Sequence, residues 1–154
     1  MKFTPAYSRR AALIALAGTL LTATSTSAQT SPVAELPRLG LKGYDPVAYF
    51  TDGRPTQGKP EFEQVFDEAR YRFASERHLA LFRANPDKYV PQFGGSCAMG
   101  MSLGRHLEAD PNNWLIADGH LYVFASPNLP DRFRADAAAR QRAEETWRKQ
   151  PRAN

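Results

Sequence analysis

The chain has 154 residues, of which 42% are hydrophobic and 23% are charged. This length and this balance are typical of one soluble globular domain, and they exclude a disordered or fibrous protein. The formal net charge is only +4, and no stripe of Lys and Arg interleaved with aromatic residues appears, so the composition argues against a nucleic-acid partner.

The first 28 residues are predicted to be a removable export signal. Basic residues precede the apolar run "AALIALAGTLL" (11–21), which is too short to span a bilayer, and "TSA" (26–28) suits a cleavage site. Arg9 and Arg10 resemble a twin-arginine signal, but Ala12 replaces the usual bulky apolar residue, so ordinary secretion remains an alternative. Loss of this segment leaves a nearly neutral chain, expected to be periplasmic or secreted in a bacterium and without stable membrane insertion.

Cys97 is the only cysteine in the sequence. A single cysteine in an exported chain cannot form an internal disulfide, so the apolar core alone must hold the fold. Cys97 is therefore free, bridged to another chain, or bound to a ligand.

A linker over residues 29–39 precedes the predicted domain, which covers residues 40–150. The stretch "GYDPVAYF" (43–50) opens this domain. Its Asp45 and Pro46 suit the N-cap and the first position of a short helix, because an aspartate oxygen can accept the free N–H groups there and proline needs no hydrogen-bond partner.

The runs "EFEQVF" (61–66) and "RYRFAS" (70–75) predict the first β-hairpin, because their aromatic residues alternate with a period of two around the turn "DEA". Ser75 suits the N-cap of a following helix, which the Asn-Pro pair at 85–86 ends. A short second helical piece is expected through "DKYVP" (87–91).

The clearest local signal is "NWLIADGHLYVF" (113–124), in which Asp118 and Gly119 suit a two-residue type I′ turn. This turn fixes the register of the second hairpin and places Leu115 opposite Tyr122. The other face is more apolar and is the predicted core side, holding Trp114, Ile116, Leu121 and Val123.

From Leu129 onward the chain is predicted to be helical, with a break near Asp136. The docking face of this region carries Ala139, Ala143 and Trp147 at four-residue intervals. No internal repeat is visible. The predicted fold class is α+β: a small single domain with two β-hairpins packed against helices and a C-terminal helix.

Three stretches, in this order, resemble the YHS domain family in its secreted bacterial branch: "GYDPVAYF" (43–50), "YRFASERHLALFRANPDKYVPQFGGSCA" (71–98) and "DPNNWLIADGHLYVF" (110–124). The resemblance covers about residues 40–125. YHS domains resemble small cysteine-dependent metal-binding modules found beside copper-transporting ATPases, so the resemblance implies a small binding module with a metal-related function.

The chain departs from the family pattern at both of its cysteines. That pattern resembles Asp-Pro-Val-Cys-Gly-Met followed by Phe-Cys-Ser, whereas this chain has Ala48 and Ala74 at the cysteine positions. Alanine has no donor atom, so the family's thiolate ligands cannot be carried over to these positions.

The side chains that remain as possible metal ligands are Cys97, Met99, Met101, His78, His106 and His120. The predicted site consists of Cys97, Met101 and His106 in the segment "GGSCAMGMSLGRH" (94–106). An extended segment would place its sulfur atoms on one face, and soft sulfur donors suit Cu(I). A helix with Ser96 as its N-cap is the favoured interpretation; Cys97 would then be the first helical residue, where a reactive thiolate is stabilised. A purely structural Cys97, with methionines that fill the core, ranks above a reactive or metal-binding Cys97.

The other polar residues have plainer explanations. His78 is expected to be solvated in the first turn of its helix, and Asp45 is interpreted as a cap rather than as a catalytic acid. His120 is not expected to be a ligand, since the family often carries lysine there. No nucleophile elbow and no phosphate-binding glycine loop is present.

These observations favour an exported, non-catalytic protein that binds a metal ion, copper first, or a metal-bearing small ligand through Cys97 with help from His106 or Met101. An enzyme that uses the Cys97 thiol ranks lowest, because no resolving cysteine exists. The alternative of another class is a metal-free interaction module that packs against a protein partner through exposed aromatic residues, Tyr44, Tyr49 and Phe50.

Overall fold

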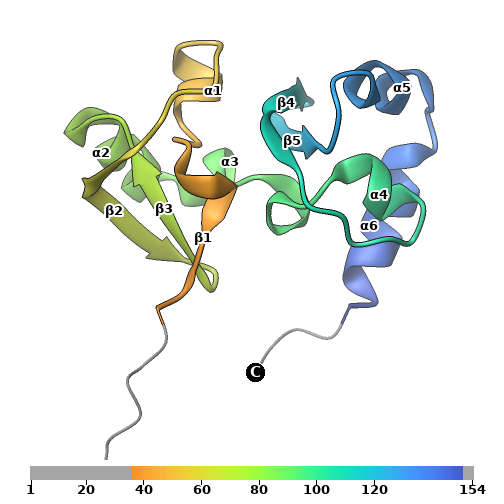
Figure 1. Cartoon of the computed structure of the whole chain (residues 1–154), viewed down its shortest axis with the longest axis horizontal. Helices are drawn as coiled ribbons and strands as arrows, with labels where there is room; N and C mark the ends of the chain where they lie inside the picture. The colour runs from red at the N-terminus through yellow and green to blue at the C-terminus, as the bar shows by residue number, and fades with distance from the viewer. Residues whose placement is uncertain (1–35, 151–154) are drawn as a thin grey trace, which may run out of the picture. The chain divides into compact units, whose positions relative to one another are not determined.

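The computed structural model describes residues 36–150, in which two small β-sheets alternate with six α-helices (Figure 1). The strands are β1 (Arg38–Leu39), β2 (Lys59–Phe66), β3 (Ala69–Phe73), β4 (Asp110–Ala117) and β5 (His120–Phe124). The helices are α1 (Ala48–Thr51), α2 (Glu76–Ala84), α3 (Pro86–Tyr89), α4 (Ala98–Ser102), α5 (Leu129–Ala135) and α6 (Ala139–Arg148). Two 3₁₀ turns are η1 (Gly40–Gly43) and η2 (Gln92–Gly95). The predicted α+β class and C-terminal helix are confirmed.

The folded region begins inside the predicted linker 29–39. Arg38 and Leu39 form strand β1, which pairs in parallel with β3, so the domain starts earlier than the sequence indicates. The predicted export signal, residues 1–28, lies outside the described residues. Within residues 36–150, no helix is both long enough and apolar enough to cross a membrane.

The first predicted hairpin is confirmed as β2 and β3. Its turn consists of Asp67 and Glu68 alone, whose φ angles of 45° and 62° define a two-residue turn of the primed kind. The second strand ends at Phe73 because Ser75 caps α2: its hydroxyl accepts the backbone N–H of His78 at 3.2 Å. Helix α2 ends before Pro86, as predicted.

The second hairpin has the predicted register, with Leu115 opposite Tyr122 across β4 and β5. The prediction that only one face of this hairpin lies in the core is incomplete, because Leu115 and Tyr122 on the other face are also buried. Helix α5 covers that face: the Phe133 ring lies 5.4 Å from the Tyr122 ring. The hairpin is thus packed on both faces, and turn residue Asp118 lies at its exposed tip.

A left-handed turn occurs twice in the chain. The φ angles are 47°, 51° and 86° at residues 41–43 and 55°, 59° and 81° at residues 93–95. Three successive positive φ angles are rare in L-residues, so their recurrence is a specific backbone signature. Each turn leads, two residues later, into a residue whose backbone N–H donates to a distant loop carbonyl at 2.9 Å, Asp45 to Thr56 and Cys97 to Leu107.

The hairpins that follow the two turns also correspond. Strand β2 begins at Lys59 and β4 begins at Asp110, 51 positions later, and the two hairpins have strands of equal length and two-residue turns. Both also break register near the start of their first strand. Their last strands run into the related sequences "YRFAS" (71–75) and "YVFAS" (122–126).

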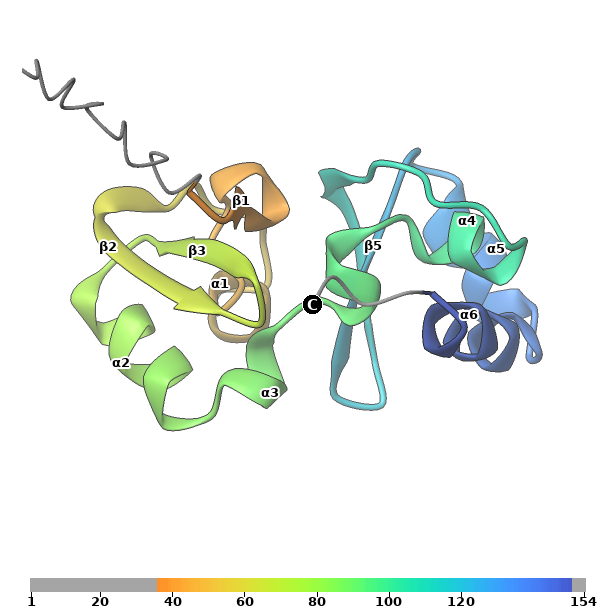
Figure 2. The same cartoon turned by 90° about the horizontal axis from the view of Figure 1, so that it is seen from below.

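The helix after each hairpin places one phenylalanine on the same pair of strand aromatics. In α2, Phe82 lies 4.9 Å from the Phe73 ring. In α5, Phe133 lies 5.4 Å from the Phe124 ring. Figure 2 shows α2 along the β2–β3 hairpin.

The described chain is therefore a tandem of two structural repeats, which we call the first repeat (residues 38–84) and the second repeat (residues 90–135), with α6 added at the end. This corrects the sequence interpretation, which found no repeat. The repeats contact each other: the Tyr49 hydroxyl donates to the Pro111 carbonyl at 2.9 Å, and its ring packs edge-on against Trp114.

Equivalent substitutions in the two repeats should destabilise the protein to similar extents. Phe82→Ala and Phe133→Ala each remove a buried ring from the same position, so each should lower the free energy of unfolding by about 3–5 kcal/mol. Val65→Ala, at a half-exposed site, should change it by less than about 0.5 kcal/mol. Urea denaturation followed by circular dichroism measures all three, and a near-neutral effect at either phenylalanine would contradict the repeat.

Candidate functional site

Cys97 caps helix α4 and is not its first residue, which corrects the predicted cap at Ser96. The Cys97 sulfur accepts the backbone N–H of Gly100 at 3.4 Å, and the side chain is fully buried. Ser96 instead lies 3.1 Å from the Nε2 atom of His106 through its hydroxyl. The structure therefore gives Cys97 a packing and capping role, as the structural alternative expected.

The three predicted metal ligands lie in different environments. Met101 is fully buried in α4, with its sulfur 3.4 Å from the side-chain amide of Gln150, whereas His106 is exposed in the loop after α4. Among residues 36–150, no group of three or more His, Cys, Asp and Glu side chains is arranged to hold a metal ion. Metal binding by Cys97 with His106 or Met101 stays a prediction.

A buried Asp–His pair is the polar feature that the sequence analysis missed. His78 was expected to be solvated, but it is 8% exposed and its Nδ1 atom lies 2.6 Å from Oδ2 of the fully buried Asp45. Asp45 Oδ1 accepts the N–H groups of Val47 and Ala48, as a capping residue would, but helix α1 begins at Ala48 and not at Pro46 as predicted. Asp45 Oδ2 also accepts the N–H of Ala74 at 2.8 Å, so one carboxylate joins α1 to the end of β3.

The second repeat shows that the fold can form without this Asp–His pair. Asp45 corresponds to Cys97, because each lies two residues after its left-handed turn. His78 corresponds to Leu129, because each lies three residues after one of the equivalent residues Ser75 and Ser126. The same turn, hairpin and helix form there with an apolar pair.

The Asp45–His78 pair has the orientation of an acid–base dyad, with His78 Nε2 3.3 Å from the Thr51 hydroxyl. That hydroxyl also lies within hydrogen-bond distance of the Val47 carbonyl. None of these residues lines the pocket of about 870 Å³ that lies beside the two left-handed turns. We therefore assign the pair to fold stabilisation.

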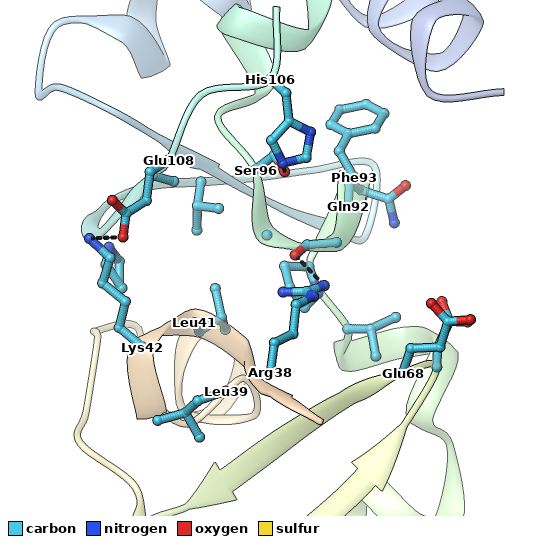
Figure 3. A pocket seen from close by; sticks show the side chains of 18 of the residues that line it. Arg38, Leu39, Leu41, Lys42, Glu68, Gln92, Phe93, Ser96, His106 and Glu108 are labelled. Atoms are coloured by element: carbon cyan, nitrogen blue, oxygen red, sulfur yellow. Dashed lines mark hydrogen bonds and ion pairs between the residues drawn. The ribbon is translucent and has the colours of Figure 1, made fainter. Parts of the chain in front are cut away.

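The larger pocket, of about 870 Å³, lies beside the two left-handed turns. Figure 3 shows side chains of β1 and η1 on one side of it, and those of η2, Ser96 and the loop after α4 on the other. Its apolar lining comes from both repeats and includes Leu39, Leu41, Val90, Phe93, Leu107 and Val123. We call it the turn pocket.

Polar groups gather at the rim of the turn pocket. Lys42 and Glu108 form an ion pair at 2.9 Å, so their charges offset each other. Arg38 donates to the Gly94 carbonyl at 2.9 Å and has no carboxylate within ion-pair distance among the described residues. The exposed His106 is the only one of the three predicted metal ligands on this lining.

Gly94 lies on the lining of the turn pocket at a position with no room for a side chain. A Cβ atom there would lie 2.9 Å from the Arg38 guanidinium and 3.2 Å from the Trp147 ring, and the residue has a φ of 59°. Both constraints favour glycine. The sequence signal was the "FGGS" stretch, which the sequence analysis attributed to the surroundings of Cys97.

The three aromatic residues that were predicted to form an exposed interaction surface are buried or half-buried. Tyr49 is 1% exposed because it fills the contact with Trp114, while Tyr44 and Phe50 are half-buried against the core. His120 is exposed, its Nδ1 atom lies 3.3 Å from the side-chain amide of Gln92, and it does not line the turn pocket.

Comparisons of the chain with protein-family models, with curated proteins and with solved structures found no match. Membership of the YHS family therefore stays a prediction from the quoted motifs.

The Asp45–His78 pair should show strong coupling in a double-mutant cycle. Asp45→Cys and His78→Leu introduce the residues of the second repeat, and each alone leaves a buried polar partner, so each should lower the free energy of unfolding by about 3–5 kcal/mol. The double variant should lose clearly less than the sum. Asp131→Ala, which breaks an exposed pair with Arg134, should cost less than about 1 kcal/mol. Additive losses in urea unfolding would contradict a direct pair.

The Cys97 thiol should react with Ellman's reagent only when the chain unfolds, because its side chain is fully buried. The rate in the native protein should therefore be the same with and without a metal chelator. An accelerated reaction after chelation would instead mean that a bound metal protects the thiol, and it would restore the predicted metal site.

Proposed function

We propose that this chain is an exported, non-catalytic binding protein that holds a small, partly apolar ligand in the turn pocket. One observation carries the proposal: a pocket of about 870 Å³ whose lining combines apolar side chains from both repeats with polar and charged groups. Small-molecule sites in proteins have this size and this composition.

The backbone around the turn pocket supports a preformed site. The left-handed turns at residues 41–43 and 93–95 fix its walls, and Arg38 ties strand β1 to η2 through the Gly94 carbonyl. A site that is built before the ligand arrives loses less conformational entropy on binding.

A metal enters this proposal as part of the ligand. His106 lines the turn pocket and is exposed, so its imidazole can reach a metal-bearing small molecule. The buried side chains of Cys97 and Met101 would need the core around α4 to open before they could bind. Copper remains the favoured metal only through the family resemblance.

Filling the turn pocket should abolish ligand binding without unfolding the protein. A library of neutral, cationic and anionic fragments, screened by ¹H–¹⁵N NMR, should shift the amide signals of Gly94, Gly95 and Ser96. Gln92→Trp places a large ring on the lining and should remove most of these shifts.

The matched control is Gln64→Trp, because Gln64 lies on β2 away from the turn pocket and bonds Arg83 on α2. This variant should keep the wild-type shifts. Unchanged binding in Gln92→Trp, or a library that moves only amides elsewhere, would contradict the proposal.

A further inference from the structure

Tyr71 has a hydroxyl group that no described residue satisfies. The residue is 3% exposed and lines the turn pocket, and its hydroxyl forms no hydrogen bond with another of the residues 36–150. The hydroxyl is not among the fully enclosed side-chain atoms without a partner in the described part of the chain, and the residue lies on the lining of the turn pocket. A buried phenol on a pocket lining that has no partner among the described residues is available as a hydrogen-bond donor.

Arg38 lies on the same face of its sheet as Tyr71. Arg38 is paired with Ala69 across β1 and β3, and Tyr71 follows two positions later, where side chains return to the same face. Burial raises the pKa of Tyr71, and the nearby Arg38 charge opposes that rise. The phenol therefore remains protonated at neutral pH and can donate.

The guanidinium of Arg38 also has free donors. One of its nitrogens donates to the Gly94 carbonyl, and a guanidinium carries five N–H groups in a planar fork. In the second repeat, Val90 takes the place of Arg38, because Pro91 pairs with Leu121 as Leu39 pairs with Arg70. The fold therefore does not require a cation at this position.

Three acidic residues also line the turn pocket, and their negative charges oppose the binding of an anion. Glu108 is offset by Lys42, whereas Asp67 and Glu68 are exposed at the tip of the β2–β3 hairpin. Water screens charges at such exposed positions, so they weaken the field at Arg38 without cancelling hydrogen bonds made directly to it.

We propose that the ligand of the turn pocket carries an anionic oxygen group, a carboxylate or a phosphate, bound between the Arg38 guanidinium and the Tyr71 hydroxyl. This inference rests on the proposed function. Charge-assisted bonds from a guanidinium fork are the usual way in which proteins hold such groups.

The walls beside Arg38 indicate the rest of the ligand. Phe93 and Trp147 both line the turn pocket, and their rings pack edge-on with centroids 6.3 Å apart. Apolar or aromatic carbon skeletons fit such a wall. The ligand class is thus a small organic acid with an apolar body.

The inference is tested with four matched probes: benzoate, phenylphosphonate, neutral benzamide and cationic benzamidine. Their affinities for the full chain are measured by NMR titration, using the Trp147 indole N–H and the Gly94 amide as reporters. An anionic probe should bind roughly tenfold more tightly than benzamide, since a hydrogen bond to a charged group is worth that much or more. The tighter of the two anions identifies the group as carboxylate or phosphate.

Variants assign the contacts. Arg38→Gln and Tyr71→Phe should each weaken the anionic probe by about tenfold and leave benzamide unchanged. Tyr71→Phe keeps the buried ring, so it preserves the fold. Arg83→Gln, at an exposed helix position, is the control and should bind like the wild type.

The outcomes separate the two proposals. If all four probes bind at the turn pocket with equal affinity, or if benzamidine binds best, the anionic group is wrong while the pocket remains a ligand site. If no probe moves the Trp147 or Gly94 signals, the proposed function itself fails.

Discussion

The left-handed turn is the constraint on which the rest of the structure depends. It occurs at residues 41–43 and again at 93–95, and each copy sends the chain into a capped helix and a β-hairpin. Both turns end in a glycine with φ above 80°, a conformation that other residues adopt only with strain. Because the two turns also form the walls of the turn pocket, the same backbone device builds the fold and the candidate site.

The repeats have kept one backbone and changed its polar residues. Where the first repeat has Asp45 and His78, the second has Cys97 and Leu129, and where the first has Arg38, the second has Val90. Differences of this kind separate what the fold requires from what it only tolerates. The fold requires the turn, the hairpin and the helix phenylalanine. The cation at Arg38 is an addition, and additions on a pocket lining are where binding chemistry is expected.

The sequence predicted the local elements well and the long-range ones poorly. Asp118-Gly119 and Ser75 are local signals, so the second hairpin register and the α2 cap could be read directly. The burial of His78 could not, because it depends on Asp45, which is 33 positions away. The repeat was missed because few letters are shared, "YRFAS" (71–75) with "YVFAS" (122–126) and "FRA" (82–84) with "FRA" (133–135), while the matching turns are defined by dihedral angles. The turn pocket joins segments from β1 to α6, so no local pattern could show it.

A crystal structure of the full chain, purified under native conditions, tests the central claim most directly. The account predicts an open pocket beside the two left-handed turns, with Arg38 bonded to the Gly94 carbonyl and the Tyr71 hydroxyl without a protein partner. Electron density for a small acid between Arg38 and Tyr71 would be the strongest support. Turns packed directly on each other, with the Trp147 or Arg38 side chain filling the space between them, would contradict it.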